Sequence, residues 1–152
     1  MEQDFLIQFK PPFRTQDGRS ELWDGVRKKW IAATPEEHVR QRMIAWLVCY
    51  AMIPISRISV ERTVPGISGR WDIAVFNNFG KPILLAECKA NSEQAESESI
   101  FQVAHYAQAI PSVSWLWISN GAWLHWLHRE SNQVPWQYTS ERSFLQYSKG
   151  SR

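Results

Sequence analysis

Two almost uninterrupted apolar segments, residues 71–76 and 83–90, constrain the fold of this chain more than any other feature. They have the sequences Trp-Asp-Ile-Ala-Val-Phe and Ile-Leu-Leu-Ala-Glu-Cys-Lys-Ala, and Asn-Asn-Phe-Gly-Lys-Pro separates them. Short runs that are apolar at both alternating positions are typical of central β-strands covered on both faces. The turn residues between them predict a hairpin within a sheet that lies between two other layers.

Three charged residues interrupt these apolar strands: Asp72 in the first, and Glu87 and Lys89 in the second. If the hairpin closes around Phe79 and Gly80, Glu87 or its immediate neighbour lies opposite Asp72, so the two carboxylates can meet on one face. Lys89 shares the face of Glu87 because side chains alternate along a strand. Burying such charges is costly unless they pair with one another or bind a metal ion. The pattern therefore predicts either a buried ion-pair cluster without catalysis or a metal site.

The two carboxylates, Asp72 and Glu87, favour a site for Mg²⁺ or Mn²⁺. Hard divalent cations of this kind are held by one or two acids, while waters and a substrate phosphate complete the octahedron. A metal bound in this way lowers the pKa of a bound water and stabilises the charge of a phosphodiester under attack. Lys89 would then position or help to activate that water and neutralise developing negative charge.

The clearest local signal is a helix that begins at Thr34 and ends at about Tyr50. Thr34 suits the N-cap, Pro35 suits the first helical position, and Glu37 completes a capping box. The predicted buried stripe consists of the apolar residues that recur at helical spacing, Val39, Met43, Trp46, Leu47 and Tyr50. On a wheel of about 100° per residue, Glu36 lies in the middle of this stripe and Glu37 lies at its flank. Glu36 is therefore the expected further carboxylate of the metal site, with Glu37 as the alternative.

The remaining periodic segments add strands and a second helix. Residues 58–64 alternate as a strand does, and apolar spacing predicts a helix over about 97–109. An Asn-Gly pair at 120–121 joins two strands, 114–119 and 122–127, in the strongest hairpin signal of the chain. Strands that surround a helix in this order predict an α/β fold with a central mixed sheet flanked by helices.

We expect residues 1–152 to form a single domain, because a chain of this length with 44% apolar residues can bury one sizeable core. Residues 1–22 are expected to form an extended N-terminal arm, and residues 130–152 an irregular tail. The formal net charge of +2 includes no basic block, so an expectation of DNA binding has to come from the site. Apolar runs shorter than about 18 residues indicate no membrane span, and the acidic N-terminus favours a cytoplasmic protein over a secreted one.

Several sequence blocks give the chain a resemblance to a known family. It resembles the N-terminal nuclease domain of type I restriction enzyme R subunits, and in particular the short stand-alone proteins that carry this domain. The resemblance covers nearly the whole chain and rests on blocks at 23–29, 34–41, 69–76, 82–90, 102–106 and 118–121. The Thr-Pro-Glu-Glu and Glu-Cys-Lys-Ala blocks, which begin at Thr34 and Glu87, are specific when they occur in this order.

The resemblance implies the restriction-endonuclease-like PD-(D/E)xK core and a metal-dependent DNA endonuclease. It implies Asp72, Glu87 and Lys89 as the catalytic set, with the backbone carbonyl of Cys88 completing the protein ligands of the metal. Its Gln-x-x-x-Tyr motif, on the helix after the catalytic strand, matches Gln102 and Tyr106. At a spacing of four residues, both side chains are expected at the flank of the apolar face, within reach of the site.

Two alternatives to a nuclease stay open. Nuclease folds are also reused for binding, so one alternative is a nucleic-acid-binding module that keeps these residues but cleaves little. The other is a structural subunit of a restriction or defence complex, with a partner surface rich in exposed Trp and Tyr. The R subunits need helicase motors, yet these 152 residues contain no phosphate-binding loop of the Gly-x-x-x-x-Gly-Lys-Ser/Thr type, so no ATP-driven motor is expected here. A homodimer is expected if both strands of a duplex are cut, because this needs two centres.

Residues outside the site receive simpler interpretations. The scattered cations, with contacts to phosphates as the alternative, are expected to be solvated surface charges: Arg27, Lys28, Lys29, Arg40, Arg57, Arg62 and Arg70. The nine tryptophans are expected to fill the core or a dimer contact rather than to stack on bases. Cys49 and Cys88 are expected to be reduced core thiols, because neither has a partner at disulfide or metal-ligand spacing.

Overall fold

The computed structural model describes residues 2–63, 70–89 and 96–150. Its helices are α1 (Glu2–Gln8), α2 (Pro35–Cys49), α3 (Glu96–Ala107) and α4 (Glu141–Gly150). Its strands are β1 (Phe13–Gln16), β2 (Arg19–Asp24), β3 (Lys29–Ala32), β4 (Ile58–Thr63), β5 (Arg70–Phe76), β6 (Pro82–Cys88), β7 (Trp115–Ser119), β8 (Leu124–His128) and β9 (Gln137–Thr139). Val64 and Ala90, the last residues of two predicted strands, lie outside the described residues, as does Gly69.

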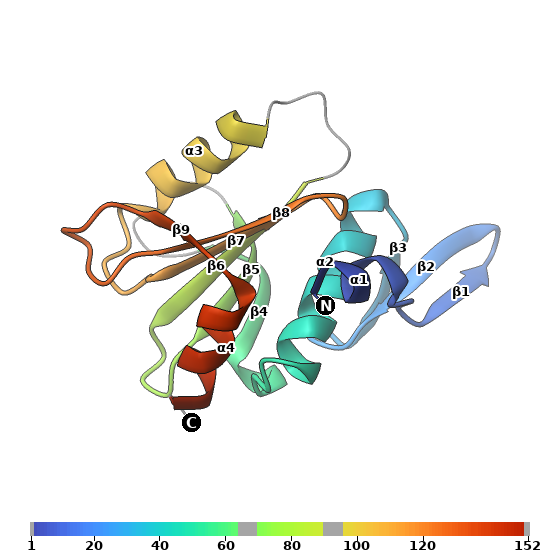
Figure 1. Ribbon diagram of the computed structural model, residues 1–152. Helices are drawn as coiled ribbons and strands as arrows, with labels where there is room; N and C mark the ends of the chain where they lie inside the picture. Colours follow the sequence, from blue (N-terminus) through green and yellow to red (C-terminus); the bar gives the residue numbers. More distant parts are fainter. Residues whose placement is uncertain (1, 64–69, 90–95, 151–152) are drawn as a thin grey trace.

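Strands β4 to β9 form one mixed sheet, in which sequence order is also spatial order. β6 and β7 pair in parallel, with α3 in the connection between them, whereas all other neighbouring strands of this sheet are antiparallel. Both predicted hairpins are present, as β5–β6 and β7–β8 (Figure 1). The predicted α/β architecture with a central mixed sheet is therefore confirmed.

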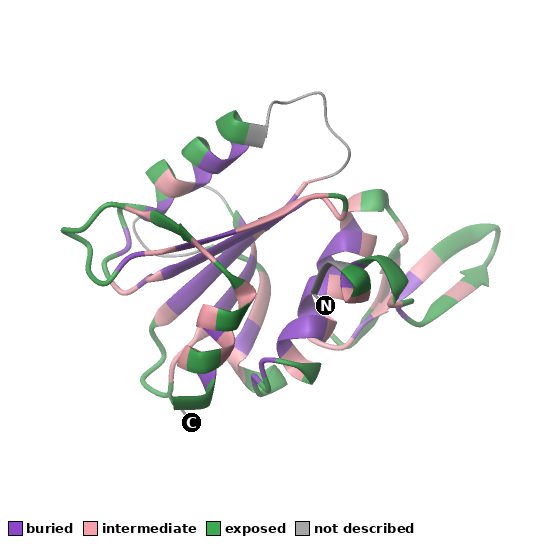
Figure 2. Ribbon diagram, in the orientation of Figure 1, coloured by how far each residue is buried: buried purple, intermediate pink, exposed green. Residues whose placement is uncertain are grey.

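Helices cover both faces of the six-stranded sheet (Figure 1). On one face, side chains of α2 and α4 share a core with Leu84 and Trp117. On the other face, α3 packs against Leu85 and Leu116. Figure 2 shows that the central strands are buried along most of their length. This coverage on both sides explains why the sequences of β6 and β7 are almost continuously apolar.

Stacked aromatic rings fill the core on the α2 face. The ring centroid of Trp46 lies 5.1 Å from that of Trp117 and 5.6 Å from that of Trp126. Phe144 from α4 adds a further ring, 4.9 Å from Trp126. All four side chains are buried, so the predicted core role is confirmed for these three tryptophans. These contacts fix α2 and α4 against the same side of the sheet.

The α2 helix begins and ends close to the predicted residues. The Thr34 hydroxyl accepts a hydrogen bond from the Glu37 amide, at 3.1 Å, as expected of an N-cap. Only this half of the predicted capping box is present, because the Thr34 amide donates to the Ala32 carbonyl and the Glu37 carboxylate binds arginines. The helix has 15 residues, and no helix in the described part of the chain is both long and apolar enough to cross a membrane.

The N-terminal region differs from the predicted extended arm. Helix α1 packs against α2, and β1, β2 and β3 form a separate antiparallel sheet that projects from the body of the molecule (Figure 1). Asp17 and Gly18 both adopt positive φ angles, 52° and 73°. Two such residues form a turn whose twist matches that of the flanking strands. Leu22 is fully buried beneath this sheet, which explains how such short strands are held.

The C-terminal region likewise differs from the predicted irregular tail. It contains the edge strand β9 and the helix α4, which begins directly after Ser140. The Ser140 hydroxyl accepts a hydrogen bond from the Ser143 amide at 3.4 Å, and the fully buried Phe144 anchors the helix on the sheet. Leu145 and Tyr147 pack against the same core, and Ser148 is buried, so the inward-facing residues of this helix do follow helical spacing. The sequence therefore contained a short amphipathic signal for α4 that the prediction missed.

The two cysteines are free, as predicted, but they differ in burial. Cys88 lies in the core, where its thiol is 3.6 Å from the Met43 sulfur, and burial raises its pKa well above the ordinary value. Cys49 is exposed at the last residue of α2, so the prediction that it is a core thiol is wrong. Trp46 and Leu47 in the same turn are buried, so Cys49 lies on the outer side of the helix.

Candidate active site

Strand pairing brings the first two candidate residues together. The observed β5–β6 register pairs Ile73 with Ala86, and its continuation by one residue places Asp72 opposite Glu87. The amide of Cys88 donates a 2.7 Å hydrogen bond to Oδ2 of Asp72, which fixes that carboxylate beside the second strand. The hairpin turn predicted Glu87 or its immediate neighbour opposite Asp72, and the continued register agrees with Glu87.

Lys89 follows directly after β6, beside this pair of carboxylates. Its ammonium nitrogen is 3.8 Å from Oε2 of Glu87, and its amide donates a 2.8 Å hydrogen bond to the Ser119 carbonyl on β7. The side chains of Asp72, Glu87 and Lys89 are each largely but not completely buried. The structure thus brings these three residues together at one end of the sheet, with access to solvent.

The acidic groups at this end of the sheet lie too close together for all of them to be charged easily. Burial, followed by the charge of Asp72 and a side-chain hydrogen bond with it, raises the pKa of Glu87 to about 9. Burial and then the charge of Asp72 also raise the pKa of Glu36. Both shifts have the direction expected when like charges share a site. An added cation would therefore be favourable here.

A buried arginine of α2, Arg40, also reaches these carboxylates. Its Nη2 lies 3.0 Å from Oδ1 of Asp72 and 3.1 Å from Oε1 of Glu36, and its Nη1 binds Glu37 and lies 3.3 Å from Oε1 of Glu61. Only 2% of the Arg40 side chain is exposed. Burial alone would lower the pKa of its guanidinium, but the surrounding acidic groups outweigh burial and raise it.

A second arginine, Arg27, extends this network to the N-terminal sheet. Its Nη2 lies 2.9 Å from Oε1 of Glu37, its Nη1 lies 3.0 Å from Oε2 of Glu61, and its Nε binds Asp24 at the end of β2. The arginine–carboxylate cluster is Asp24, Arg27, Glu36, Glu37, Arg40, Glu61 and Asp72. It connects β2, α2, β4 and β5 through charged side chains.

The prediction that Arg27 and Arg40 are solvated surface charges is wrong. Both are engaged with carboxylates that come from distant parts of the sequence, and Arg40 is fully buried. One local signal could have identified Arg40, because it follows Glu37 by three residues and Glu36 by four. Residues at these spacings are neighbours on a helix surface.

The two glutamates at the start of α2 have different surroundings. The Glu36 side chain is 45% exposed and reaches the site through Arg40, whereas the Glu37 side chain is 12% exposed and binds Arg27 and Arg40. The expectation that Glu36 lies in the buried stripe and Glu37 at its flank is wrong, because Glu37 is the buried glutamate. Glu36 is still near Asp72, because both carboxylates contact Nη2 of Arg40.

Gln102 and Tyr106 lie on α3, on the other face of the sheet. Both side chains are exposed, Tyr106 to 45%, while Val103 and Ala107 form the buried side of the helix. Among the described residues, no hydrogen bond or ion pair connects Gln102 or Tyr106 to Asp72. The structure therefore does not bring this motif into contact with the acids.

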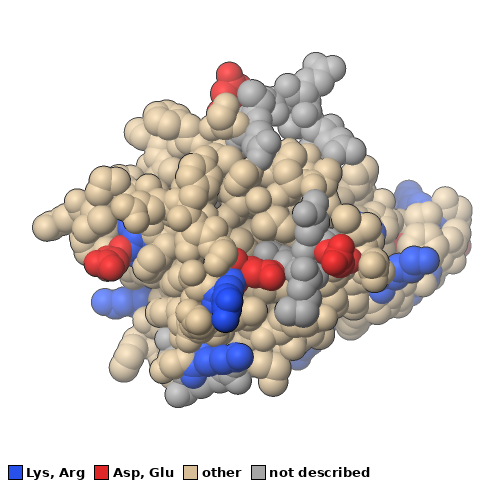
Figure 3. Space-filling view, viewed as in Figure 1, with Lys and Arg blue, Asp and Glu red and all other residues tan. Residues whose placement is uncertain are grey.

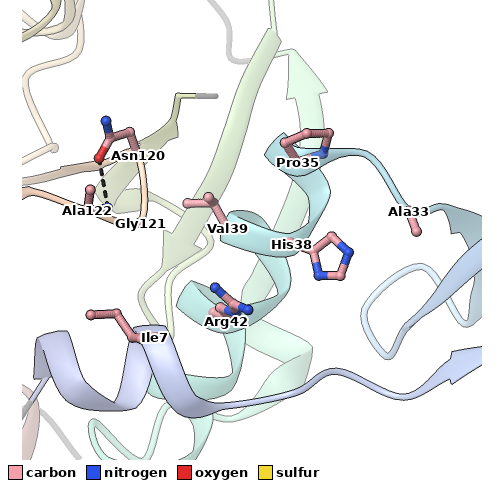
Figure 4. A pocket seen from close by; sticks show the side chains of 9 residues that line it. All are labelled: Ile7, Ala33, Pro35, His38, Val39, Arg42, Asn120, Gly121 and Ala122. Carbon is pink, nitrogen blue, oxygen red and sulfur yellow. Dashed lines mark hydrogen bonds between the residues drawn. The ribbon is translucent and has the colours of Figure 1, made fainter. Parts of the chain in front are cut away.

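An open pocket of about 680 Å³ lies on the opposite flank of the α2 N-terminus, between α1, α2 and the β7–β8 turn (Figure 4). It is lined by Ile7, Ala33, Pro35, His38, Val39, Arg42, Asn120, Gly121 and Ala122. Pro35 precedes Glu36 directly, and Asn120 follows Ser119, whose carbonyl accepts the Lys89 amide. None of Glu36, Asp72, Glu87 and Lys89 is among the residues that line this pocket.

The donor atoms at the site suit a hard divalent cation. In the described part of the chain, no group of three or more His, Cys, Asp or Glu side chains is arranged to hold a metal ion. Mg²⁺, however, is usually held by only one or two carboxylates, with waters and substrate oxygens as its other ligands. Asp72 and Glu87 provide two adjacent carboxyl groups, and the raised pKa of Glu87 means that the two are not readily charged together unless a cation is present, so these residues fit such an ion.

One face of the molecule can be inspected for a basic patch in Figure 3. On the face shown in Figure 3, acidic and basic side chains are interspersed, and neither sign forms a continuous patch. A basic patch is the usual footprint of nucleic-acid binding. As expected from the net charge, any recognition of nucleic acid on this face has to depend on the site itself.

Comparison with known families gives one match. The family model described as the type I restriction enzyme R protein N terminus matches residues 35–141, whereas a comparison with curated proteins finds no match. The matched segment runs from the first residue of α2 to the first residue of α4 and contains every candidate site residue. Because the match covers well over half of the sequence, the chain belongs to the family of type I restriction enzyme R protein N-terminal domains.

Proposed function

We propose that this chain is a divalent-metal-dependent DNA nuclease with a PD-(D/E)xK-type active centre. The observation that carries the proposal is the arrangement of Asp72, Glu87 and Lys89. Two carboxylates face each other across neighbouring strands, and the ammonium group lies 3.8 Å from one of them. Membership of a restriction-enzyme family supports DNA as the substrate and a restriction system as the setting.

The proposed metal ligands are the carboxylates of Asp72 and Glu87 and the backbone carbonyl of Cys88, with Glu36 reaching the metal or its waters. When bound, Mg²⁺ or Mn²⁺ would supply an activated water and stabilise negative charge on the phosphate. The 2.7 Å hydrogen bond from the Cys88 amide holds the Asp72 carboxylate in place for this role. Deprotonated Glu87 is needed, so metal binding should strengthen as the pH rises toward about 9.

Lys89 is proposed to act on the attacking water and on the phosphate. Its ammonium group is held near Glu87, and its backbone is held by the bond to Ser119. From this position it can donate a hydrogen bond to the oxygen that develops charge during attack. Because the ammonium cannot accept a proton while it is charged, Lys89 orients the water rather than serving as the initial base.

Gln102 and Tyr106 are proposed to contact the substrate rather than the metal. Their exposure on α3 leaves both side chains available to a bound strand. The pocket beside Pro35 and Asn120 offers space for the part of the DNA strand that continues from the scissile phosphate toward α2. A homodimer would bring two such centres to the two strands of a duplex.

A nucleic-acid-binding module that cleaves little is the second candidate function. The observation that favours it is that both oxygens of Asp72 already have partners, Arg40 and the Cys88 amide. A carboxylate neutralised in this way would have less tendency to bind a metal ion. The same site would then serve only to hold DNA.

Cleavage of linear, supercoiled circular and single-stranded DNA in Mg²⁺ or Mn²⁺ tests the proposal. We expect Asp72→Asn and Lys89→Ala to lower the cleavage rate by at least about 100-fold. The matched controls are Asp17→Asn, at an exposed hairpin turn, and Lys81→Ala, at the far end of the β5–β6 hairpin.

The pattern of results separates the two functions. Cleavage that is lost in both site variants and kept in both controls supports the nuclease, and conversion of supercoiled DNA directly to the linear form supports paired centres. Binding of DNA without cleavage, unchanged in Asp72→Asn, would instead support the binding module.

A further inference from the structure

Arg40 is the only counter-charge in contact with Asp72 among the described residues. The guanidinium is buried, and each of its four ion-pair partners is a carboxylate. Its Nε is buried without a hydrogen-bond partner in the described part of the chain. Arg40 is thus held by charge through its two terminal nitrogens, and its third donor is not anchored.

The charges around Arg40 do not balance. The carboxylates that share ion pairs in this region are Asp24, Glu36, Glu37, Glu61, Asp72 and Glu87, and the cations are Arg27, Arg40 and Lys89. Six acidic groups therefore face three cations, and Asp72 and Glu87 each have one direct cationic partner, whereas Glu37 and Glu61 each have two. A further cation would be attracted to this part of the cluster.

An incoming divalent cation would meet Arg40 at Asp72. Oδ2 of Asp72 accepts a hydrogen bond from the Cys88 amide and Oδ1 is 3.0 Å from the Arg40 Nη2, so a cation that binds this carboxylate shares it with the guanidinium. Two positive charges on one carboxylate repel each other strongly at such distances. Each of them therefore lowers the affinity of the site for the other.

We infer that Arg40 is the resident counter-ion of Asp72 and competes with a divalent cation for that carboxylate. In the metal-free protein Arg40 keeps the acids together, and on metal binding its hold on Asp72 weakens while Glu36, Glu37 and Glu61 retain it. This inference rests on the metal site of the proposed function but not on cleavage. It makes Arg40 a residue that sets how tightly the site binds metal.

The competing explanation is that Arg40 positions Asp72 for the metal. The two explanations differ in sign. If Arg40 competes, its neutral replacement binds metal more tightly; if it positions Asp72, the same replacement binds metal more weakly. Arg40→Lys also separates the two explanations. Lysine keeps the positive charge that would compete with the metal, but one ammonium group cannot bridge and position four carboxylates as the guanidinium does.

The experiment measures Mn²⁺ binding by calorimetry and the Mn²⁺-induced shift in melting temperature, using the full chain. The variants are Arg40→Gln, Arg40→Lys and Arg129→Gln. Arg129 is the matched control because it is equally buried but hydrogen-bonds only to uncharged oxygens. Melting in the absence of Mn²⁺ gives the cost of each substitution to the fold.

We expect Arg40→Gln to bind Mn²⁺ at least about tenfold more tightly than the native protein and to show a larger melting shift. Arg40→Lys should stay within about threefold of native affinity because the charge is retained. Arg129→Gln should lower the melting temperature without changing the Mn²⁺ affinity. If Arg40→Gln folds only with Mn²⁺ present, this also supports the inference, because the metal then replaces the missing counter-charge.

Weaker Mn²⁺ binding in Arg40→Gln or a tenfold loss in Arg40→Lys would overturn the inference in favour of positioning. The lysine variant decides the question if the glutamine variant does not fold under any condition. The native protein tests the proposed function separately. If only Arg40→Gln responds to Mn²⁺, the inference holds while the metal dependence of the native protein fails; if no variant responds, both fail.

Discussion

Two arginines are buried to the same extent in different regions of the molecule, and their partners differ completely. Arg40 is 2% exposed and is surrounded by carboxylates, whereas Arg129 is 1% exposed and donates to the carbonyls of Val113, Ala107 and Ile110 and to the Gln108 side chain. Arg129 also lies over the Trp136 ring, 4.4 Å from its centroid. The pKa of Arg129 is lowered by burial, and that of Arg40 is raised by its acidic neighbours.

The difference distinguishes a structural arginine from one that belongs to a site. Carbonyl partners are fixed by the backbone, and all three nitrogens of Arg129 are bound, so this region needs no further ion or ligand. Carboxylate partners bring charge of their own, and around Arg40 they exceed the cations. Burial of an arginine therefore says little about its role until the charge of its partners is counted.

The largest effect on stability is expected when Arg129 is replaced. Arg129→Met should lower the free energy of unfolding by about 3 kcal/mol or more, because it leaves several buried carbonyl groups without donors. The loss should be the same with and without Mn²⁺ and between pH 5 and pH 9, because none of these partners titrates. Urea unfolding measures it, and the exposed Arg142→Met is the control.

A loss that depends on Mn²⁺ would contradict this prediction, because it would couple Arg129 to the metal site. The two arginines would then no longer represent separate roles, and the comparison of their partners would lose its meaning.

Much of the architecture could be predicted from the sequence because its signals are local. The apolar runs of β5, β6 and β7, the Thr34 cap of α2 and the Asn120-Gly121 turn each occupy a few consecutive residues. The turn limited the partner of Asp72 to Glu87 or its immediate neighbour and no further, because a register shift between Val75 and Phe76 separates the turn from the pairing of Ile73 with Ala86.

The arginine–carboxylate cluster could not be predicted in the same way. Glu61 and Asp72 approach Arg40 only after β4 and β5 pack beside α2, and Asp24 comes from the separate N-terminal sheet. A helix wheel places Arg40 correctly but cannot tell whether solvent or carboxylates surround it. The N-terminal sheet and α4 were missed although both have local signals, the Asp17-Gly18 turn in the sheet and the helical spacing of Phe144 and Tyr147 in α4.

A stability effect of intermediate size is expected from Glu87, the acidic residue beside Asp72 whose pKa is raised. Its pKa is raised from 4.5 to about 9, so the folded state binds a proton that the unfolded state has lost across this range. Stability of the metal-free protein should therefore fall as the pH rises from about 4.5 to 9, and this effect should vanish in Glu87→Gln.

Urea unfolding in EDTA at pH 4, 7 and 9 measures this prediction. We expect Glu87→Gln to be more stable than the native protein by about 2 kcal/mol at pH 9 and to match it near pH 4. If the free energy of unfolding changes with pH in the same way for both proteins, the pKa of Glu87 is not raised. The charges around Arg40 would then be balanced, as the partners of Arg129 are.

The smallest effect is expected from Glu61, which tests whether burial rather than pairing determines the strength of the cluster. Glu61 contacts both Arg27 and Arg40, as Glu37 does, but its side chain is 42% exposed. Glu61→Gln should therefore lower the free energy of unfolding by less than about 1 kcal/mol, because exposed ion pairs are weak. The buried Glu37→Gln should cost about 2 kcal/mol or more, because it leaves two arginines with fewer buried partners.

Salt should sharpen the difference between these two glutamates. Raising the ionic strength from about 0.1 M to 1 M shortens the screening length from about 10 Å to 3 Å, which weakens exposed pairs more than buried ones. The small cost of Glu61→Gln should then disappear, while that of Glu37→Gln should persist. Equal costs for both variants at both ionic strengths would mean that solvent reaches the whole cluster. In that case Arg40 would behave as a hydrated cation. It would then differ from Arg129 because water reaches it, and not because its partners are charged.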